Sequence, residues 1–105
     1  MAVRVNESNF EEEVLKTQEL VLVDFYSDSC IPCKQISPIL GELEEQYKSQ
    51  IKIVKVNVNF DESIASNYKV MVSPTIVFIK EGREINRTRG FTKREELKEI
   101  INKII

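Results

Sequence analysis

The chain has 105 residues, which is the usual size of one domain and too few for two. Apolar residues make up 42% of it, enough to bury a core without metal or disulfide staples. Its 15 basic and 17 acidic residues give a net charge of −2, which argues against a nucleic-acid-binding protein because such proteins usually carry a basic excess. No apolar run has the length of a signal peptide or a membrane span, so we expect a soluble, cytosolic protein without a membrane partner.

The absence of histidine and the presence of only two cysteines exclude several kinds of chemistry. Without histidine, the chain cannot form a Ser-His-Asp triad, a Cys-His nucleophile pair or a histidine metal site. Its two cysteines cannot complete a four-ligand zinc site within one chain. We therefore expect no metal site and no bound cofactor.

Strands and helices are predicted to alternate from the N-terminus. A short strand is predicted at residues 2–5, followed by a helix over Glu7–Lys16 with Asn6 as its N-cap. Leu20–Tyr26 is a nearly continuous apolar run, typical of a strand covered on both faces. The apolar spacing of Ile31–Tyr47 then predicts a long helix with a proline in its first turn.

The second half of the chain continues the alternation and ends in a hairpin and a helix. Strands are predicted at Ile51–Val58, Thr75–Ile79 and Arg83–Thr88, and a short helix at Asp61–Tyr68 with Asp61 as its cap. The turn Glu81-Gly82 should make the last two strands an antiparallel hairpin. The sequence Thr92-Lys93-Arg94-Glu95 has the pattern of a capping box at the start of a final amphipathic helix. The whole pattern predicts an α/β fold with a mixed sheet.

Cys30 and Cys33 lie between the buried strand and the long helix. Residues three apart on a helix share a face with Cβ atoms about 5–6 Å apart, close to the reach of a disulfide. A helix N-terminus offers free N–H groups and a partial positive charge, which stabilise a reactive thiolate at Cys30. Cys33, one turn further on, should be more buried and act second.

The cysteine pair has other interpretations besides redox chemistry. A disulfide that closes a four-residue loop would add only about 2 kcal/mol of stability, which makes it a poor structural staple. Half of a zinc site shared between two chains remains open but requires a dimer, and two inert buried cysteines remain open as well. The spacing and context favour redox chemistry.

The run VLVDFYSDSCIPCKQISPIL, residues 21–40, resembles the active-site segment of the thioredoxin family. In that family a strand is followed by Trp-Cys-Gly-Pro-Cys-Lys and a kinked helix. The segments VKVNV and VSPTIVFIKEG and the region of Gly90 match in order and spacing, so the resemblance covers essentially the whole chain. It implies one thioredoxin-like domain over residues 1–105, with a five-stranded mixed sheet flanked by four helices.

The resemblance also implies roles for two charged residues near the cysteines. Asp24 would be a buried acid that relays a proton to and from Cys33, although from the sequence alone it could also be an exposed position at a strand edge. Lys55 would lie near this acid and tune it, although it could equally be a solvated strand lysine.

The same resemblance implies a substrate-binding surface around Cys30. Pro74 would be preceded by a cis peptide bond and face the cysteines, and the backbone of Ser73 would bind an incoming peptide in an extended form. Gly90 would allow the substrate to approach closely, unless it only ends a strand. The remaining members of this surface are Ser29, Ile31 and Pro32.

Three departures from the family pattern put partner choice in doubt. Tyr26 and Ser29 stand where tryptophan is common, and Ile31 replaces a glycine. We expect a monomeric thiol–disulfide oxidoreductase that reduces protein disulfides and is itself reduced by a thioredoxin reductase, which could be a dedicated one. The alternatives are a specialised thioredoxin-like protein with one partner, a glutaredoxin, and a non-catalytic binding subunit that kept the fold.

Overall fold

The computed structural model describes residues 3–105 and contains one mixed sheet with the strand order β1-β3-β2-β4-β5. The strands are β1 (Val3–Arg4), β2 (Leu20–Tyr26), β3 (Ile51–Asn57), β4 (Thr75–Lys80) and β5 (Arg83–Arg89). The first three in chain order pair in parallel, whereas β4 pairs antiparallel with both β2 and β5. Ala2, part of the first predicted strand, lies outside the described residues.

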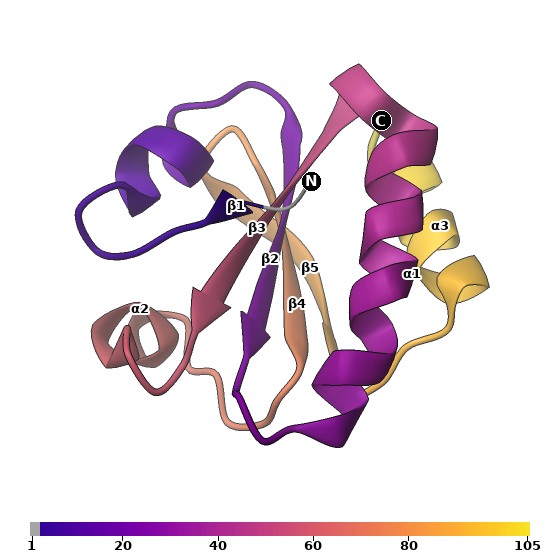
Figure 1. Ribbon diagram of the computed structural model, residues 1–105. Coiled ribbons are helices and arrows are strands. Elements are labelled where there is room, and N and C mark those ends of the chain that lie inside the picture. Colours follow the sequence, from indigo (N-terminus) through magenta and orange to yellow (C-terminus); the bar gives the residue numbers. More distant parts are fainter. Residues whose placement is uncertain (1–2) are drawn as a thin grey trace.

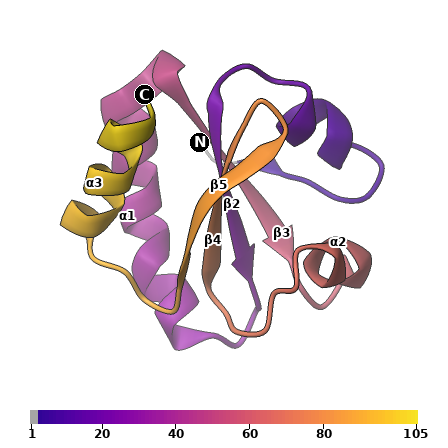
Figure 2. The same ribbon diagram turned by 180° about the vertical axis from the view of Figure 1, so that it is seen from behind.

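Helices cover both faces of this sheet (Figures 1 and 2). They are η1 (Glu11–Leu15), α1 (Ile31–Tyr47), which continues into the single turn η2 (Lys48–Gln50), α2 (Glu62–Asn67) and α3 (Arg94–Ile104). Helices α1 and α3 lie on one face, and η1 and α2 lie on the other. The predicted five-stranded mixed sheet flanked by four helices is therefore confirmed. In the part of the chain that is described, no helix has both the length and the apolar character needed to span a membrane.

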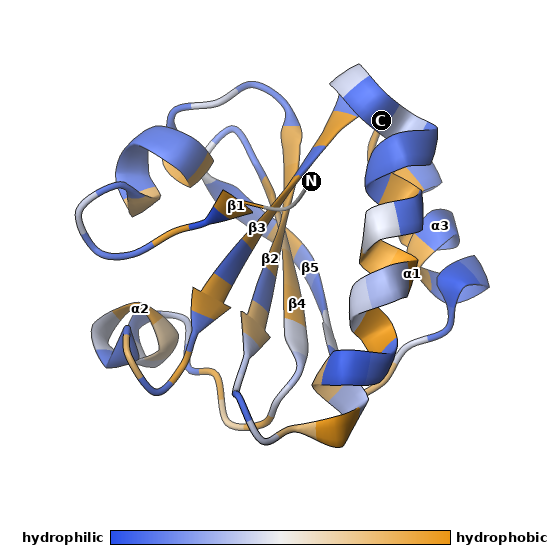
Figure 3. Ribbon diagram, in the orientation of Figure 1, coloured by the Kyte–Doolittle hydropathy of each residue, from blue (hydrophilic) through white to orange (hydrophobic). Residues whose placement is uncertain are grey.

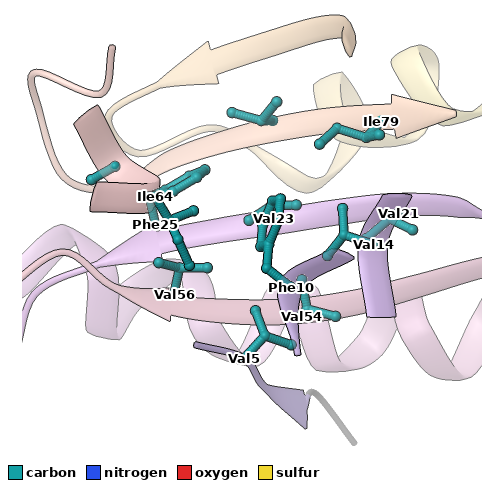
Figure 4. Packing of buried hydrophobic residues seen from close by; sticks show 12 residues of the cluster. Val5, Phe10, Val14, Val21, Val23, Phe25, Val54, Val56, Ile64 and Ile79 are labelled. Carbon is teal, nitrogen blue, oxygen red and sulfur yellow. The ribbon is translucent and has the colours of Figure 1, made fainter. Parts of the chain in front are cut away.

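The alternation of side chains along β2 divides the core into two halves. Leu20 and Leu22 point to α1 and α3, whereas Val21, Val23 and Phe25 point to η1 and α2. Figure 4 shows the second group packed with residues from neighbouring strands and from both helices on that side. The hydrophobic colours in Figure 3 gather on the central strands, while the helices alternate hydrophobic and hydrophilic residues. Because β2 is buried on both faces, a polar residue within it must lie in one half of the core.

The predicted N-cap at Asn6 is wrong. Helix η1 begins only at Glu11, and its C-terminal Lys16 N–H bonds to the Glu11 carbonyl, an i→i+5 pattern. The side chain of Asn6 accepts a hydrogen bond from the Ser8 N–H at 2.9 Å, and its carbonyl accepts one from the Phe10 N–H at 2.9 Å. Asn6 therefore organises the turns before the helix, as asparagine commonly does in Asx-turns.

The other two predicted caps are also wrong in their hydrogen bonds. Asp61 occupies the N-cap position of α2 but makes no capping bond, because its backbone (φ −116°, ψ 56°) is not in the extended conformation typical of that position. Helix α3 begins after Lys93 rather than after Thr92. The buried Thr92 hydroxyl instead donates to the Gly90 carbonyl at 3.3 Å, so no capping box forms.

Gly82 in the β4–β5 turn and Gly41 in α1 should respond in opposite ways to substitution by alanine. Glu81 and Gly82 both have positive φ, and a Cβ on Gly82 would meet the Leu15 carbonyl oxygen at 3.3 Å. Gly82→Ala should lower the free energy of unfolding by about 1 kcal/mol or more. Gly41, inside α1, is the matched control because a Cβ added there would have no atom within 4 Å, so Gly41→Ala should raise that energy by up to about 1 kcal/mol. Urea denaturation of both variants checks this, and equal effects would contradict it.

Candidate redox site

The two cysteines lie at the start of α1, where the chain leaves the end of β2. Cys30 is the N-cap of this helix, and its sulfur accepts a hydrogen bond from the Cys33 backbone N–H at 3.1 Å. Pro32 occupies the first turn, where its missing N–H leaves no helical bond unmade. The two sulfur atoms are joined in a disulfide, with the Cα atoms 5.2 Å apart. The predicted geometry of the pair is therefore present.

The environments of the two cysteines differ. Cys33 is buried, with 5% of its surface exposed, and belongs to the core beneath α1. Cys30 is partly exposed, and its neighbours Ser29, Ile31 and Pro32 are exposed. An incoming molecule can therefore reach Cys30 first. The helix N-terminus and the Cys33 N–H both favour negative charge on the Cys30 sulfur once the disulfide is opened.

A second loop lies against Cys30 at the same end of the sheet, the lower end in Figure 1. The Cys30 sulfur is 3.4 Å from the carbonyl oxygen of Ser73, and the Ser73–Pro74 peptide bond is cis, the isomer that the resemblance implies. The Thr75 hydroxyl donates to the Val72 carbonyl at 2.7 Å, and the Gly90 N–H donates to the Pro74 carbonyl at 2.7 Å. The loop is thus held in place from both sides.

Asp24 lies in the half of the core that faces α1, in the same alternating row of β2 as Leu20 and Leu22. Its exposed fraction is 1%, so the reading as an exposed edge position does not hold. Neither carboxylate oxygen has a hydrogen-bond partner among the described residues. Desolvation therefore raises the pKa of Asp24 to about 6, and the positive charge of Lys55 opposes part of that rise.

Lys55 occupies the position of β3 that is directly opposite Asp24 in the parallel register. Its ammonium nitrogen lies 4.8 Å from the centre of the Tyr26 ring, a cation–π contact. Within residues 3–105, no ion pair joins Lys55 to Asp24 at 4.0 Å or less, so Lys55 acts on the acid through the electric field rather than through a hydrogen bond.

A cavity of about 220 Å³ connects these groups, and its lining includes Cys33, Asp24, Lys55 and Tyr26. It is large enough for several water molecules, which could carry a proton between the thiol and the carboxylate. Among the described residues, no group of three or more cysteine or carboxylate side chains is arranged to bind a metal ion. The site therefore offers thiol and carboxylate chemistry.

The structure brings most of the predicted residues together and adds some that the sequence reasoning missed. Gly90 has a φ of +79°, and no atom lies within 4 Å of a Cβ added there, so the glycine both ends the strand and leaves open space. Met71 and Val72, whose side chains are 87% and 47% exposed, extend the apolar surface beside Ser73. Ser37 lines the cavity and was missed, although its position four residues after Cys33 places it on the same helix face.

Comparison with known proteins is consistent with this geometry. The family model described as Thioredoxin matches residues 1–103. The chain is 34% identical to thioredoxin 1 of Synechococcus elongatus over 98% of this chain and 96% of that protein. It is 36% identical to a thioredoxin of Rickettsia felis over the full length of both, and 37% identical to one of Staphylococcus haemolyticus over 96% and 95%. The chain therefore belongs to the thioredoxin family, and its cysteine pair is a dithiol–disulfide exchange centre.

Proposed function

We propose that this protein reduces protein disulfides with Cys30 as the nucleophile and Cys33 as the resolving thiol. The observation that carries the assignment is the difference between the two sulfurs. Cys30 is partly exposed and accepts the Cys33 N–H at a helix N-terminus, whereas Cys33 is buried beside Asp24. The thiolate is the attacking species, so the sulfur that is both reachable and stabilised as an anion acts first.

The exchange has two steps. The Cys30 thiolate attacks one sulfur of the substrate disulfide, forming a mixed disulfide and releasing the other substrate sulfur as a thiolate. Cys33 then transfers its proton to Asp24 and attacks Cys30, which releases the second substrate thiolate and leaves the Cys30–Cys33 disulfide. A reductase returns two electrons to this disulfide, and no bound cofactor is needed.

The substrate-binding surface follows from the groups around Cys30. An extended peptide would pair with the backbone of Ser73 next to the cis Pro74, and Gly90 would leave room for it. The exposed apolar side chains of Ile31, Met71 and Val72 would cover the apolar part of the partner. The site is complete within one chain, so we propose a monomer, acting in the cytosol where thiols are kept reduced.

The proposal also concerns which reductase returns electrons to this protein. Ser29, directly before the nucleophile, is small and exposed, so it offers less contact area than a tryptophan would. Ile31 supplies apolar area at a different place on the surface. We propose that the protein is a poor substrate for a general thioredoxin reductase and works with a dedicated one. Reduction of insulin by the protein separates this enzyme from a non-catalytic binding subunit, and a glutathione-coupled assay separates it from a glutaredoxin.

The division of labour between the cysteines is tested by single serine substitutions. Cys30→Ser should abolish exchange, because the remaining thiol is buried. Cys33→Ser should still attack but stall as a mixed disulfide, which trapping from lysate followed by non-reducing electrophoresis detects. Mixed disulfides with the Cys30→Ser protein and none with the Cys33→Ser protein would reverse the assignment.

The burial of Asp24 predicts how stability depends on pH. Its folded pKa of about 6 lies above the ordinary value of 3.8, so the folded state binds the proton more tightly. This favours folding below about pH 4, and the benefit is lost as the pH rises through about 6, at a cost of about 3 kcal/mol at neutral pH. Asp24→Asn should therefore raise the free energy of unfolding at pH 7 by about 1–3 kcal/mol, a gain that shrinks toward pH 4.

The same substitution should slow the release of mixed disulfides, because the proton acceptor for Cys33 is removed. Urea denaturation at several pH values and stopped-flow measurement of the resolving step check the two effects separately. A variant less stable than the wild type at pH 7 would show that the carboxylate is paired rather than desolvated.

The choice of reductase is tested with Ser29→Trp. Covering about 50 Å² more surface is worth about 1.2 kcal/mol, and ordering costs cancel part of it, so kcat/KM with a general thioredoxin reductase should rise several-fold but less than about tenfold. The change should lie mainly in KM, because Cys30 itself is unaltered. Gln46→Trp, at an exposed position near the far end of α1, controls for the added ring. Wild-type turnover equal to that of an ordinary thioredoxin, unimproved by Ser29→Trp, would refute the proposal.

A further inference from the structure

A second and larger cavity lies on the other side of Asp24 from the cysteines. Its volume is about 460 Å³, and it lies between α1 and β3, where Leu40, Gly41 and Ile53 line it. Two carboxylates of α1, Glu44 and Glu45, also line this cavity. The smaller cavity beside Cys33 shares three lining residues with the larger one, namely Asp24, Ser37 and Lys55. The two cavities therefore meet at the buried acid.

The openings of the two cavities are on different parts of the surface. The lining of the smaller cavity includes Asp28 and Lys34, exposed residues within three positions of a cysteine. The proposed substrate-binding surface, which includes Ser29 and Pro32, lies next to these residues in the chain. The larger cavity instead opens along the flank of α1, beside Gly41 and Glu45, which are exposed and lie well beyond the first turn of the helix. A bound substrate leaves this side free.

Gly41 has no packing reason to be a glycine. It lies inside α1, where glycine costs about 1 kcal/mol relative to alanine. A Cβ built on it meets no atom within 4 Å, so neither a close contact nor a special backbone conformation requires it. The absent side chain does leave the wall of the larger cavity open. Ser37, one helical turn earlier, is a polar residue at the junction of the two cavities.

We propose that Asp24 exchanges its proton with solvent through the cavity between α1 and β3, and that the Ser37 hydroxyl is the polar link at the junction with the cavity of Cys33. This inference rests on the proposed role of Asp24 in resolution and names the route by which that role is completed. Ser37 is a positioning residue in this scheme, since it holds water or a proton between groups that react.

The proton balance requires a route from Asp24 to solvent. During resolution the Cys33 thiol gives its proton to the Asp24 carboxylate, and the resulting thiolate displaces the substrate from Cys30. Asp24 is then a neutral acid inside an oxidised protein and must lose the proton to water before it can accept another. The flank of α1 offers this proton a path to water that lies away from the proposed substrate-binding surface around Cys30.

Several charged groups face this path and set its pH dependence. Lys55 approaches Asp24 from β3, while Glu44 and Glu45 line the cavity from α1. Lys34 and Asp28 line the smaller cavity beside Cys33, and Asp28 accepts a hydrogen bond from Asn57 at 3.2 Å. Glu45 forms an ion pair with Lys48 at 3.4 Å, so Lys48 is a further charged group at this exit.

The link is tested with a pair of substitutions of equal shape, Ser37→Val and Ser37→Thr. Valine fills the junction with apolar atoms, whereas threonine keeps the hydroxyl. In the oxidised protein, the titration midpoint of Asp24, followed by the NMR signal of its carboxyl carbon, should rise by about one unit in Ser37→Val and stay near the wild-type value in Ser37→Thr. At pH 7 the resolving step should slow several-fold in the valine variant alone.

The exit is tested with Gly41→Leu, which places apolar atoms in the mouth of the cavity, against Gln46→Leu at an exposed position of the same helix. We expect Gly41→Leu to raise the Asp24 midpoint and slow resolution, and Gln46→Leu to do neither. The decisive arm uses Cys33→Ser protein joined to the insulin B chain. Asp24 should titrate in this complex as it does in free Cys33→Ser protein, because the substrate leaves the flank open.

Two results would overturn the inference. One is an Asp24 that ceases to titrate when the insulin B chain covers the cysteines. The other is a Gly41→Leu or Ser37→Val protein that folds, titrates and resolves like the wild type. The first step keeps these outcomes separate from the proposed function, since attack by Cys30 of the wild-type protein on insulin tests that function without any change to the route. Loss of that attack in the wild type would refute the proposed function instead.

Discussion

The hydrogen bond from the Cys33 N–H to the Cys30 sulfur joins the chemistry of this protein to its fold. It exists only because α1 begins at Ile31, so that one of the free N–H groups of the first turn points at the preceding residue. The position of that helix is fixed in turn by Ile36, Leu40 and Leu43, which pack on the sheet. The core beneath α1 therefore decides where a thiolate is stable.

The same half of the core contains the carboxylate of Asp24, whose burial costs free energy. Asp24 continues the row of Leu20 and Leu22 toward α1, and an apolar residue there would make the fold more stable. The carboxylate is useful in this place because Cys33 lies across a shared cavity and Lys55 keeps its pKa from rising further. Stability at neutral pH and the resolving step thus oppose each other at a single side chain.

Much of the fold follows from local patterns. The bounds of Leu20–Tyr26 and Ile31–Tyr47 agree with those predicted, because a doubly buried strand requires a continuous apolar run and a long amphipathic helix requires a helical period. The capping predictions at Asn6 and Thr92 are wrong, and Asp61 occupies its predicted N-cap position without a capping hydrogen bond. A potential capping side chain can form its hydrogen bond with the helix or with another nearby group. The Thr92 hydroxyl forms its hydrogen bond with the Gly90 carbonyl instead of with the helix. Such competition depends on how neighbouring loops pack, and the periodicity of the sequence does not show that packing.

The sequence by itself determined the cysteine pair, the strand that buries Asp24 and the family resemblance, because these rest on short runs of residues and on their order along the chain. Only the tertiary structure decided which groups meet across the sheet. It placed the Ser73 carbonyl 3.4 Å from Cys30, the Lys55 ammonium over the Tyr26 ring, and Ser37 at the junction of two cavities. Each contact joins elements brought together by strand order and helix packing. Distances of this kind arise from long-range packing, and local sequence carries no measure of them.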